Sequence, residues 1–129
     1  MSSSTATTSG VRVDVVSRFD PTRSNPESGT WFFLYQVRIT NESEVTVQLT
    51  HRHWVIADGN GQVDEVRGAG VVGKQPMLAP GEHFEYTSGC PLTTQFGIMH
   101  GTYRIKTDAG DAFDAEVAPF QLGEPETTH

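Results

Sequence analysis

The sequence predicts an all-β fold, an antiparallel β-sandwich of about seven strands. Three observations indicate this fold class. Between its two ends the 129-residue chain alternates apolar and polar residues with a period of two, and clusters of Gly, Pro, Asn and Asp separate the apolar runs. No stretch long enough for a helix carries an apolar stripe with caps. This combination is typical of immunoglobulin or fibronectin III-like sandwiches.

The first predicted strands lie on either side of an irregular connection. Residues 11–19 alternate valines with polar residues, as expected of a half-buried strand. Residues 20–30 contain two prolines and suit an exposed loop. Residues 31–40 carry apolar side chains on both faces, which favours a central strand.

Two turn sequences predict hairpins in the rest of the domain. The DGNG sequence at residues 58–61 lies inside a predicted hairpin from Val45 to Arg67. The turn at residues 108–110 lies inside a second one. Trp54 is the expected core tryptophan of the sandwich.

The chain is expected to form one domain with two tails. Residues 1–10 are almost entirely Ser, Thr and Ala, and residues 123–129 are also poor in apolar side chains, so both are predicted to be flexible. Residues 11–122 form the predicted domain. No composition shift or internal repeat divides it.

The net charge, the length of the apolar runs and the N-terminal sequence exclude several classes of partner and compartment. With 9 Lys and Arg against 16 Asp and Glu, the net charge of −7 opposes nucleic acid or an anionic membrane as the main partner. No apolar run is long enough for membrane insertion, and the N-terminus lacks the pattern of a secretory signal. The expected compartment is the cytoplasm. No cofactor is expected.

A glycine pattern in the middle of the chain resembles the phosphate-binding turn of dinucleotide enzymes. Gly68, Gly70 and Gly73 have the spacing G-x-G-x-x-G. In such enzymes a helix begins at the last glycine and its N-terminus binds the pyrophosphate. Pro76 and Pro80 prevent a regular helix from starting there. The dinucleotide interpretation therefore fails.

Three interpretations of this segment remain open. The glycines can serve only to bend the chain between strands. Alternatively, their N–H groups form an anion-binding concavity for phosphate or pyrophosphate, with Lys74 and Arg67 supplying positive charge. In the third interpretation the segment is a protein-binding loop.

Other residue types with catalytic or metal-binding chemistry do not form a recognisable motif. His51 and His53 can present two imidazoles on one side of a strand, but the sequence does not bring a third ligand to them, so no metal site is predicted. Cys90 has no neighbouring base and is expected to be a small buried hydrophobic residue. No enzymatic activity is predicted.

A series of separated motifs resembles the ApaG family. The segment from Glu65 to Pro76 fits E-V-x-G-x-G-V-V-G-x-Q-P, and L-x-P-G-E, Y-T-S-G and G-x-M-x-G-x-Y follow it. The resemblance runs from about Val11 to Leu122. Lys74 stands where the family pattern varies, which weakens a phosphate site that depends on its side chain.

The resemblance implies a single fibronectin III-like sandwich with no catalytic reaction attached to it. The family is associated with cobalt and magnesium efflux, and similar domains occur in F-box proteins and in a polymerase-interacting protein. These fusions favour a cytoplasmic protein-binding module with an unidentified partner. Trp31 and Arg52 are the candidate partner-binding residues, because interface hot spots favour Trp and Arg. Open sheet edges make a homodimer a further expectation.

Overall fold

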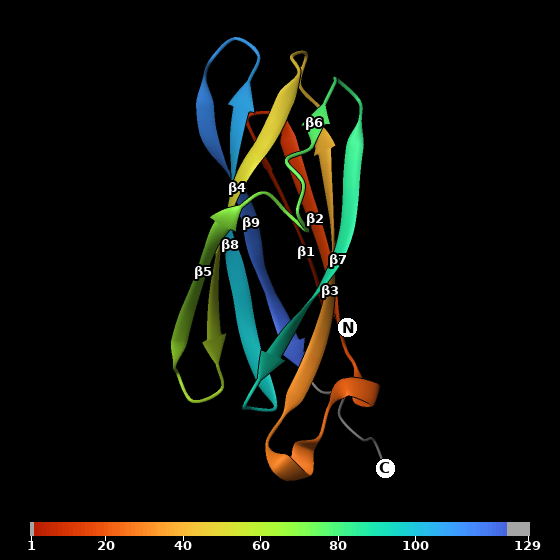
Figure 1. Cartoon of the computed structure of the whole chain (residues 1–129), viewed down its shortest axis with the longest axis vertical. Helices are drawn as coiled ribbons and strands as arrows, with labels where there is room; N and C mark the ends of the chain where they lie inside the picture. The colour runs from red at the N-terminus through yellow and green to blue at the C-terminus, as the bar shows by residue number, and fades with distance from the viewer. Residues whose placement is uncertain (1, 124–129) are drawn as a thin grey trace.

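Two antiparallel sheets pack face to face in the computed structural model, which describes residues 2–123 (Figure 1). The predicted sandwich is confirmed. The four-stranded sheet has the order β1 (Ser2–Thr8), β2 (Val11–Phe19), β3 (Trp31–Asn41) and β7 (His83–Leu92). The five-stranded sheet has the order β5 (Val63–Ala69), β4 (Val47–Asp58), β8 (Phe96–Thr107) and β9 (Ala112–Gly123), and the short β6 (Met77–Leu78) pairs with β4.

The core lies between the inner faces of the two sheets. Trp54, only 3% exposed, occupies its centre, as predicted. Its ring makes edge contacts with Tyr35, Tyr103 and Phe120 at centroid distances of 5.4, 5.8 and 6.0 Å. Tilted and perpendicular arrangements of this kind are favourable for aromatic rings. This cluster joins the two sheets, because Tyr35 belongs to β3 and Trp54 to β4.

The expectation of a flexible tail over residues 1–10 is wrong where the structure describes it. Residues 2–8 form β1, which pairs with β2 from Ser2 opposite Ser17 to Thr8 opposite Val11. The turn between the two strands places Ser9 at φ 47° and Gly10 at φ 81°. Two positive φ values in a two-residue connection are the geometry that hairpins prefer. Small Ser, Thr and Ala side chains suffice because the strand gains its stability from backbone pairing.

The connection between β2 and β3 contains little regular structure. Residues 20–30, predicted as a loop, contain two short 3-10 turns, Pro21–Arg23 and Pro26–Ser28. No helix in the described part of the chain has the length and apolarity to cross a membrane. At the other end β9 continues to Gly123, and the remainder of the predicted C-terminal tail, 124–129, lies outside the described residues.

Both predicted hairpins are present. β4 and β5 are joined through Gly61 at φ 82°, and the N–H of Asp58 donates to the carbonyl of Gln62 at 2.9 Å. β8 and β9 are joined through Gly110 at φ 92°. β3 pairs with β2 on one side and β7 on the other, which confirms that it is a central strand.

The two lateral sides of the sandwich differ. On one side β1 lies against β9: the Ser4 hydroxyl donates to the carbonyl of Ala118 at 2.8 Å, and the N–H of Glu116 donates to the Thr8 hydroxyl at 3.0 Å. On the other side β5 and β7 are the outer strands of their sheets, and no strand pairing joins them within residues 2–123 (Figure 1). The sandwich is thus closed at β1 and β9 and open at β5 and β7.

Candidate functional site

The outer face of the five-stranded sheet brings distant parts of the sequence together through strand register. His53 lies between Arg67 of β5 and Thr102 of β8. The next row away from the β4–β5 turn contains His51 and Arg104. Because side chains alternate between the two faces of a strand and Trp54 points into the core, its neighbour His53 points outward.

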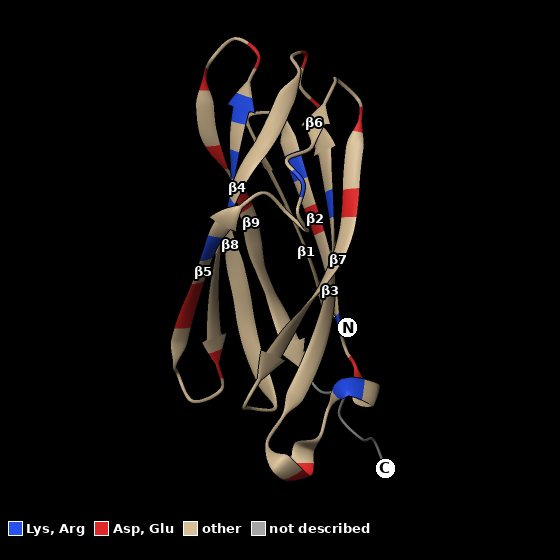
Figure 2. Ribbon diagram, in the orientation of Figure 1, with Lys and Arg blue, Asp and Glu red and all other residues tan. Residues whose placement is uncertain are grey.

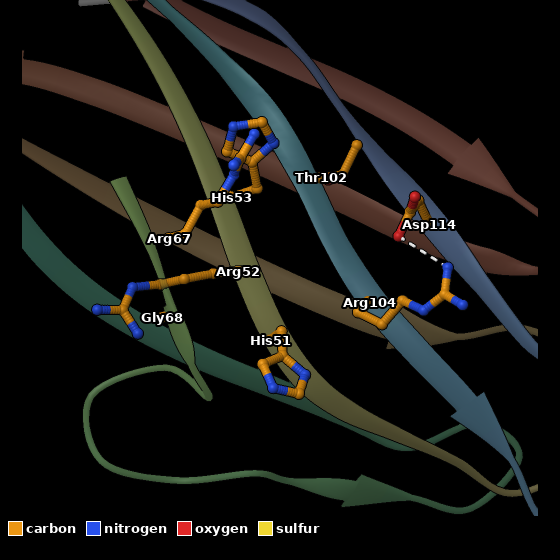
Figure 3. A pocket seen from close by; sticks show the side chains of 8 residues that line it. All are labelled: His51, Arg52, His53, Arg67, Gly68, Thr102, Arg104 and Asp114. Carbon is orange, nitrogen blue, oxygen red and sulfur yellow. Dashed lines mark hydrogen bonds and ion pairs between the residues drawn. The ribbon is translucent and has the colours of Figure 1, made fainter. Parts of the chain in front are cut away.

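A pocket of about 330 Å³ occupies this outer face. Its lining comes from four adjacent strands, β5, β4, β8 and β9. Cationic and imidazole groups dominate it, in a chain whose net charge is −7. The side chains are shown in Figure 3: His51, Arg52, His53, Arg67, Gly68, Thr102, Arg104 and Asp114.

Two carboxylates beside this pocket pair with its cations. Arg104 Nη1 lies 3.3 Å from Asp114 Oδ1, an ion pair between β8 and β9 that is visible in Figure 3. Glu65 Oε1 is shared by His53 Nε2 at 2.8 Å and Arg67 Nη2 at 3.4 Å. Figure 2 shows the same alternation, with basic and acidic segments next to one another along β5. Pairs this exposed contribute little to stability, so they remain available for exchange with a ligand.

Arg52 has a different role from the other cations. Its Nη1 group donates to the carbonyls of Ala69 at 3.1 Å and Gly70 at 2.9 Å, which fixes the end of β5. A Cβ atom at Gly68 would lie 2.8 Å from Arg52 Nη1. Glycine at position 68 therefore leaves the space that the guanidinium occupies. The predicted site residues Arg67, Gly68 and Arg52 are brought together in this way.

The remaining glycines of the predicted anion site form a tight turn away from this pocket. Val71 and Lys74 exchange two backbone hydrogen bonds, at 2.8 and 2.9 Å, around Val72 at φ 43° and Gly73 at φ 77°. The N–H of Gly70 donates to the carbonyl of Thr50 at 2.8 Å. No helix follows, as the prolines predict.

The hydrogen bonds of this turn limit what it offers to an anion. The N–H groups of Gly70, Val71 and Lys74 already donate to carbonyl oxygens. Those three donors are therefore not free to line a concavity for phosphate. Gly70, Gly73 and Lys74 are also absent from the lining of the cationic pocket.

Trp31, the other candidate partner-binding residue, lies far from the pocket in the fold. It begins β3 opposite Leu92 and packs, half-buried, against the core. Its indole nitrogen is buried and has no hydrogen-bond partner among the described residues. Trp31 and Arg52 thus do not share one surface patch.

Sequence reasoning missed the residues that β8 and β9 contribute to this face. Thr102, Arg104 and Asp114 line the pocket. The outward direction of Thr102 and Arg104 could have been read from the alternation around Tyr103 and Ile105, and that of Asp114 from its place beside Ala115. Their nearness to His51 and His53 depends on the pairing of β4 with β8, which local patterns do not specify.

The same face also carries an apolar row near the β4–β5 turn. Val63, Ala57 and Ile98 lie side by side on β5, β4 and β8. Val63 is 61% exposed, Ile98 45%, and the neighbouring Phe96 59%. We call Val63, Phe96 and Ile98 the apolar row.

The histidine pair lines the pocket without forming a metal cluster. His51 and His53 both contribute to the lining, as their alternation suggests. His53 is hydrogen-bonded to Glu65, and the nearest bond of His51 is with the Thr50 hydroxyl at 3.1 Å. Residues 2–123 contain no group of three or more His, Cys, Asp or Glu side chains arranged to hold a metal ion.

Cys90 is buried, as predicted, and 5% exposed. Burial, with a smaller contribution from the negative charge of Asp64, raises the pKa of its thiol to about 11. A nucleophilic cysteine needs the opposite shift, because only the thiolate reacts. The thiol therefore behaves as part of the core.

Comparisons with known proteins agree with the motifs and the fold. The family model described as the ApaG domain matches residues 21–107. Protein ApaG of Anaeromyxobacter dehalogenans is 56% identical over 122 residues, covering 95% of this chain and 96% of the relative. Protein ApaG of Beijerinckia indica is 51% identical over 118 residues, covering 92% and 91%.

A solved structure supports the same assignment. The crystal structure of a Bordetella pertussis protein described as ApaA superposes with a TM-score of 0.88 at 50% identity, covering 91% of this chain and 95% of that one. A match at this identity over nearly the whole length of both chains relates sequence as well as fold. The chain belongs to the ApaG family.

Proposed function

We propose that the protein is a non-enzymatic, cytoplasmic binding module that docks a protein partner on the outer face of the five-stranded sheet. The observation that carries the proposal is the apolar row beside the cationic pocket. Val63, Phe96 and Ile98 are 61%, 59% and 45% exposed on one end of the same sheet. An exposed apolar patch next to polar residues is typical of an interaction surface.

The neighbouring pocket supplies the polar part of such an interface. Arg67 and Arg104 flank it, and their guanidinium groups can exchange Glu65 and Asp114 for carboxylates of a partner. Arg is enriched at interface hot spots, and complementary charge accelerates association. A partner with an apolar side chain next to an acidic one therefore fits this face.

The experiment compares two single substitutions on opposite outer faces. Ile98→Asp places a charge in the apolar row, and Gln36→Asp places the same charge on exposed β3 of the other sheet. Both positions are solvent-accessible, so we expect both variants to fold. Affinity capture from the native organism should recover one stoichiometric partner with wild type and Gln36→Asp, and lose it with Ile98→Asp. Equal recovery with both variants would refute the proposed surface.

A second candidate function is the binding of a small anion, phosphate or pyrophosphate, at the cationic pocket. The observation that favours it is the convergence of Arg67, Arg104, His51 and His53 on one hollow. The backbone N–H groups of Gly70, Val71 and Lys74 donate to carbonyl oxygens, so Arg67 and Gly68 are the members of the predicted anion site that line this pocket. A pyrophosphate titration followed by NMR should move the signals of residues 53, 67 and 104. No shift at millimolar pyrophosphate would remove this candidate.

Two further parts of the proposal concern ion efflux, which comes from the family resemblance, and self-association, which comes from the open sheet edges. We propose that the protein affects cobalt and magnesium efflux through its protein partner. The open edges of β5 and β7 could pair with a second copy of the chain and form a homodimer. Light scattering at micromolar protein concentration measures the molar mass in solution, which should be twice 14.1 kDa if the chain dimerises.

A further inference from the structure

A second pocket opens between the two sheets, on the side where β5 and β7 do not pair. It has a volume of about 510 Å³ and is lined by residues of both strands and of the core beneath them. Ligand sites in proteins are usually concave, mostly apolar and of this size. We call this pocket the lateral groove.

The base of the lateral groove is aromatic and apolar. Tyr35, Trp54 and Met99 line it, and each is almost fully buried. Val66 of β5 and Pro91 of β7 form opposite walls. The indole N–H of Trp54 is buried and has no acceptor among the described residues. A buried donor left without an acceptor costs about 1–3 kcal/mol, so this part of the core is incompletely satisfied.

One cation lines the groove without a carboxylate partner. Arg52 uses Nη1 for the carbonyls of Ala69 and Gly70. Within residues 2–123 its Nε and Nη2 groups have no acceptor, and no Asp or Glu forms an ion pair with it. A guanidinium held by backbone carbonyls keeps its full charge and is positioned to receive an anion.

The two acidic residues of the groove do not cancel this charge. Glu65 binds His53 and Arg67 on the outer face of β5. Asp64 lies near Cys90, where its negative charge acts on the thiol. The groove therefore has a positive end at Arg52, an acidic side chain near Cys90, and an aromatic base.

We infer that the lateral groove binds a small, flat apolar molecule that carries one carboxylate. Its apolar body lies on Tyr35, Trp54 and Met99, and its carboxylate accepts hydrogen bonds from the free Nε and Nη2 of Arg52. Planar guanidinium and carboxylate groups pair through two parallel hydrogen bonds, which gives orientation as well as affinity. Arg52 lines both this groove and the cationic pocket, but the apolar row of the outer face lies outside the groove.

A matched pair of probes tests the inference. 2-Naphthoate has the required shape and charge, and 2-naphthylmethanol has the same ring system without the charge. The chain has two tryptophans, so an NMR spectrum of the ¹⁵N-labelled protein shows two indole N–H signals, and the Trp31→Phe variant assigns them. We expect naphthoate to move the Trp54 signal saturably and to bind at least tenfold more tightly than the alcohol.

Variants of β5 and Arg52 locate the site. Val66→Phe fills the groove and should weaken naphthoate binding at least tenfold. Val63→Phe, on the outer face of the same strand, should leave it within twofold. Arg52→Gln retains a donor for the loop carbonyls but no charge, and should make the two probes bind equally. If Arg52→Gln does not fold, the comparison of the two probes in wild type still decides the role of charge.

Three results would overturn the inference. The first is the lack of any saturable shift of Trp54 at millimolar naphthoate. The second is equal affinity of the charged and neutral probes for wild type. The third is a loss of binding in Val63→Phe as large as that in Val66→Phe. The first two results leave the partner surface untested, because Ile98 lies outside the groove. The third would place the probe on the apolar row, to which Val63 belongs.

Discussion

Alanine substitutions at Gly70 and Gly73 should separate two reasons for glycine in one turn. Gly73 has φ 77°, and a Cβ atom there would meet nothing within 4 Å. Only the left-handed backbone opposes a side chain, so Gly73→Ala should destabilise the protein by about 1–2 kcal/mol. Gly73→Asn should cost less, because Asn tolerates this conformation better than Ala.

Gly70 adds a steric cost to the same backbone strain. Its φ is 65°, and a Cβ atom there would clash with the carbonyl oxygen of Lys74, which accepts the hydrogen bond of Val71. Adding overpacking of about 1–3 kcal/mol to the conformational cost gives about 2–5 kcal/mol for Gly70→Ala. The turn would have to deform to admit the methyl group.

Urea unfolding, followed by the fluorescence of Trp31 and Trp54, measures the stability of all three variants. The midpoint should fall in the order wild type, Gly73→Asn, Gly73→Ala, Gly70→Ala, with the denaturant slope unchanged. Equal destabilisation by the two alanine variants would refute the assigned turn geometry. Unchanged midpoints in both would show that the glycines are not needed for folding and reopen a binding role.

Three other measurements follow from buried groups and from β1. Burial raises the pKa of Cys90 from 9.0 to about 11, so the neutral thiol stabilises the folded state below pH 9. The free energy of unfolding should therefore fall by about 2–3 kcal/mol as the pH rises to about 11. Urea unfolding should show a smaller fall in Cys90→Ala, and identical pH profiles for wild type and Cys90→Ala would contradict this. The hydroxyls of Tyr86 and Tyr103 are hydrogen-bonded to each other in the core. Tyr86→Phe should therefore lower the free energy of unfolding by about 1–3 kcal/mol, because the Tyr103 hydroxyl loses its partner. The double Phe variant should lose less than the sum of the two single losses, and a double loss equal to that sum would refute the pairing. Amide hydrogen exchange should show protection at the alternate amides of Ser2–Thr8 that face β2, whereas a lack of protection at all of them would restore the predicted tail.

The sequence predicted the parts of the fold that depend on local patterns. Alternation of apolar residues located β2, β3 and the hairpins, and Trp54 was assigned to the core because large rings in a small sandwich are buried there. β1 is not predicted because its residues carry no large apolar side chain to produce an alternating pattern. The Ser9-Gly10 pair was the available signal, since it suits a two-residue hairpin turn.

The candidate site was less predictable because it depends on pairing between distant strands. The sequence predicts Arg67 and Gly68 for an anion site and Arg52 for a partner surface, and the β4–β5 register places all three side by side. Arg104 and Asp114 reach the same pocket only through the order β5-β4-β8-β9. The family resemblance predicted the sandwich fold of the domain but did not predict any contact between these side chains. The open side between β5 and β7 likewise follows from strand order and not from any motif.

The most direct test of the proposed partner surface is a photocrosslinking residue at position 98, with position 36 as the control. Both sites are exposed, and they lie on the outer faces of opposite sheets. Irradiation of cells should join the position 98 variant to one discrete protein and leave the position 36 variant without that adduct. The same adduct at both positions, or an adduct at position 36 alone, would contradict docking on the five-stranded sheet.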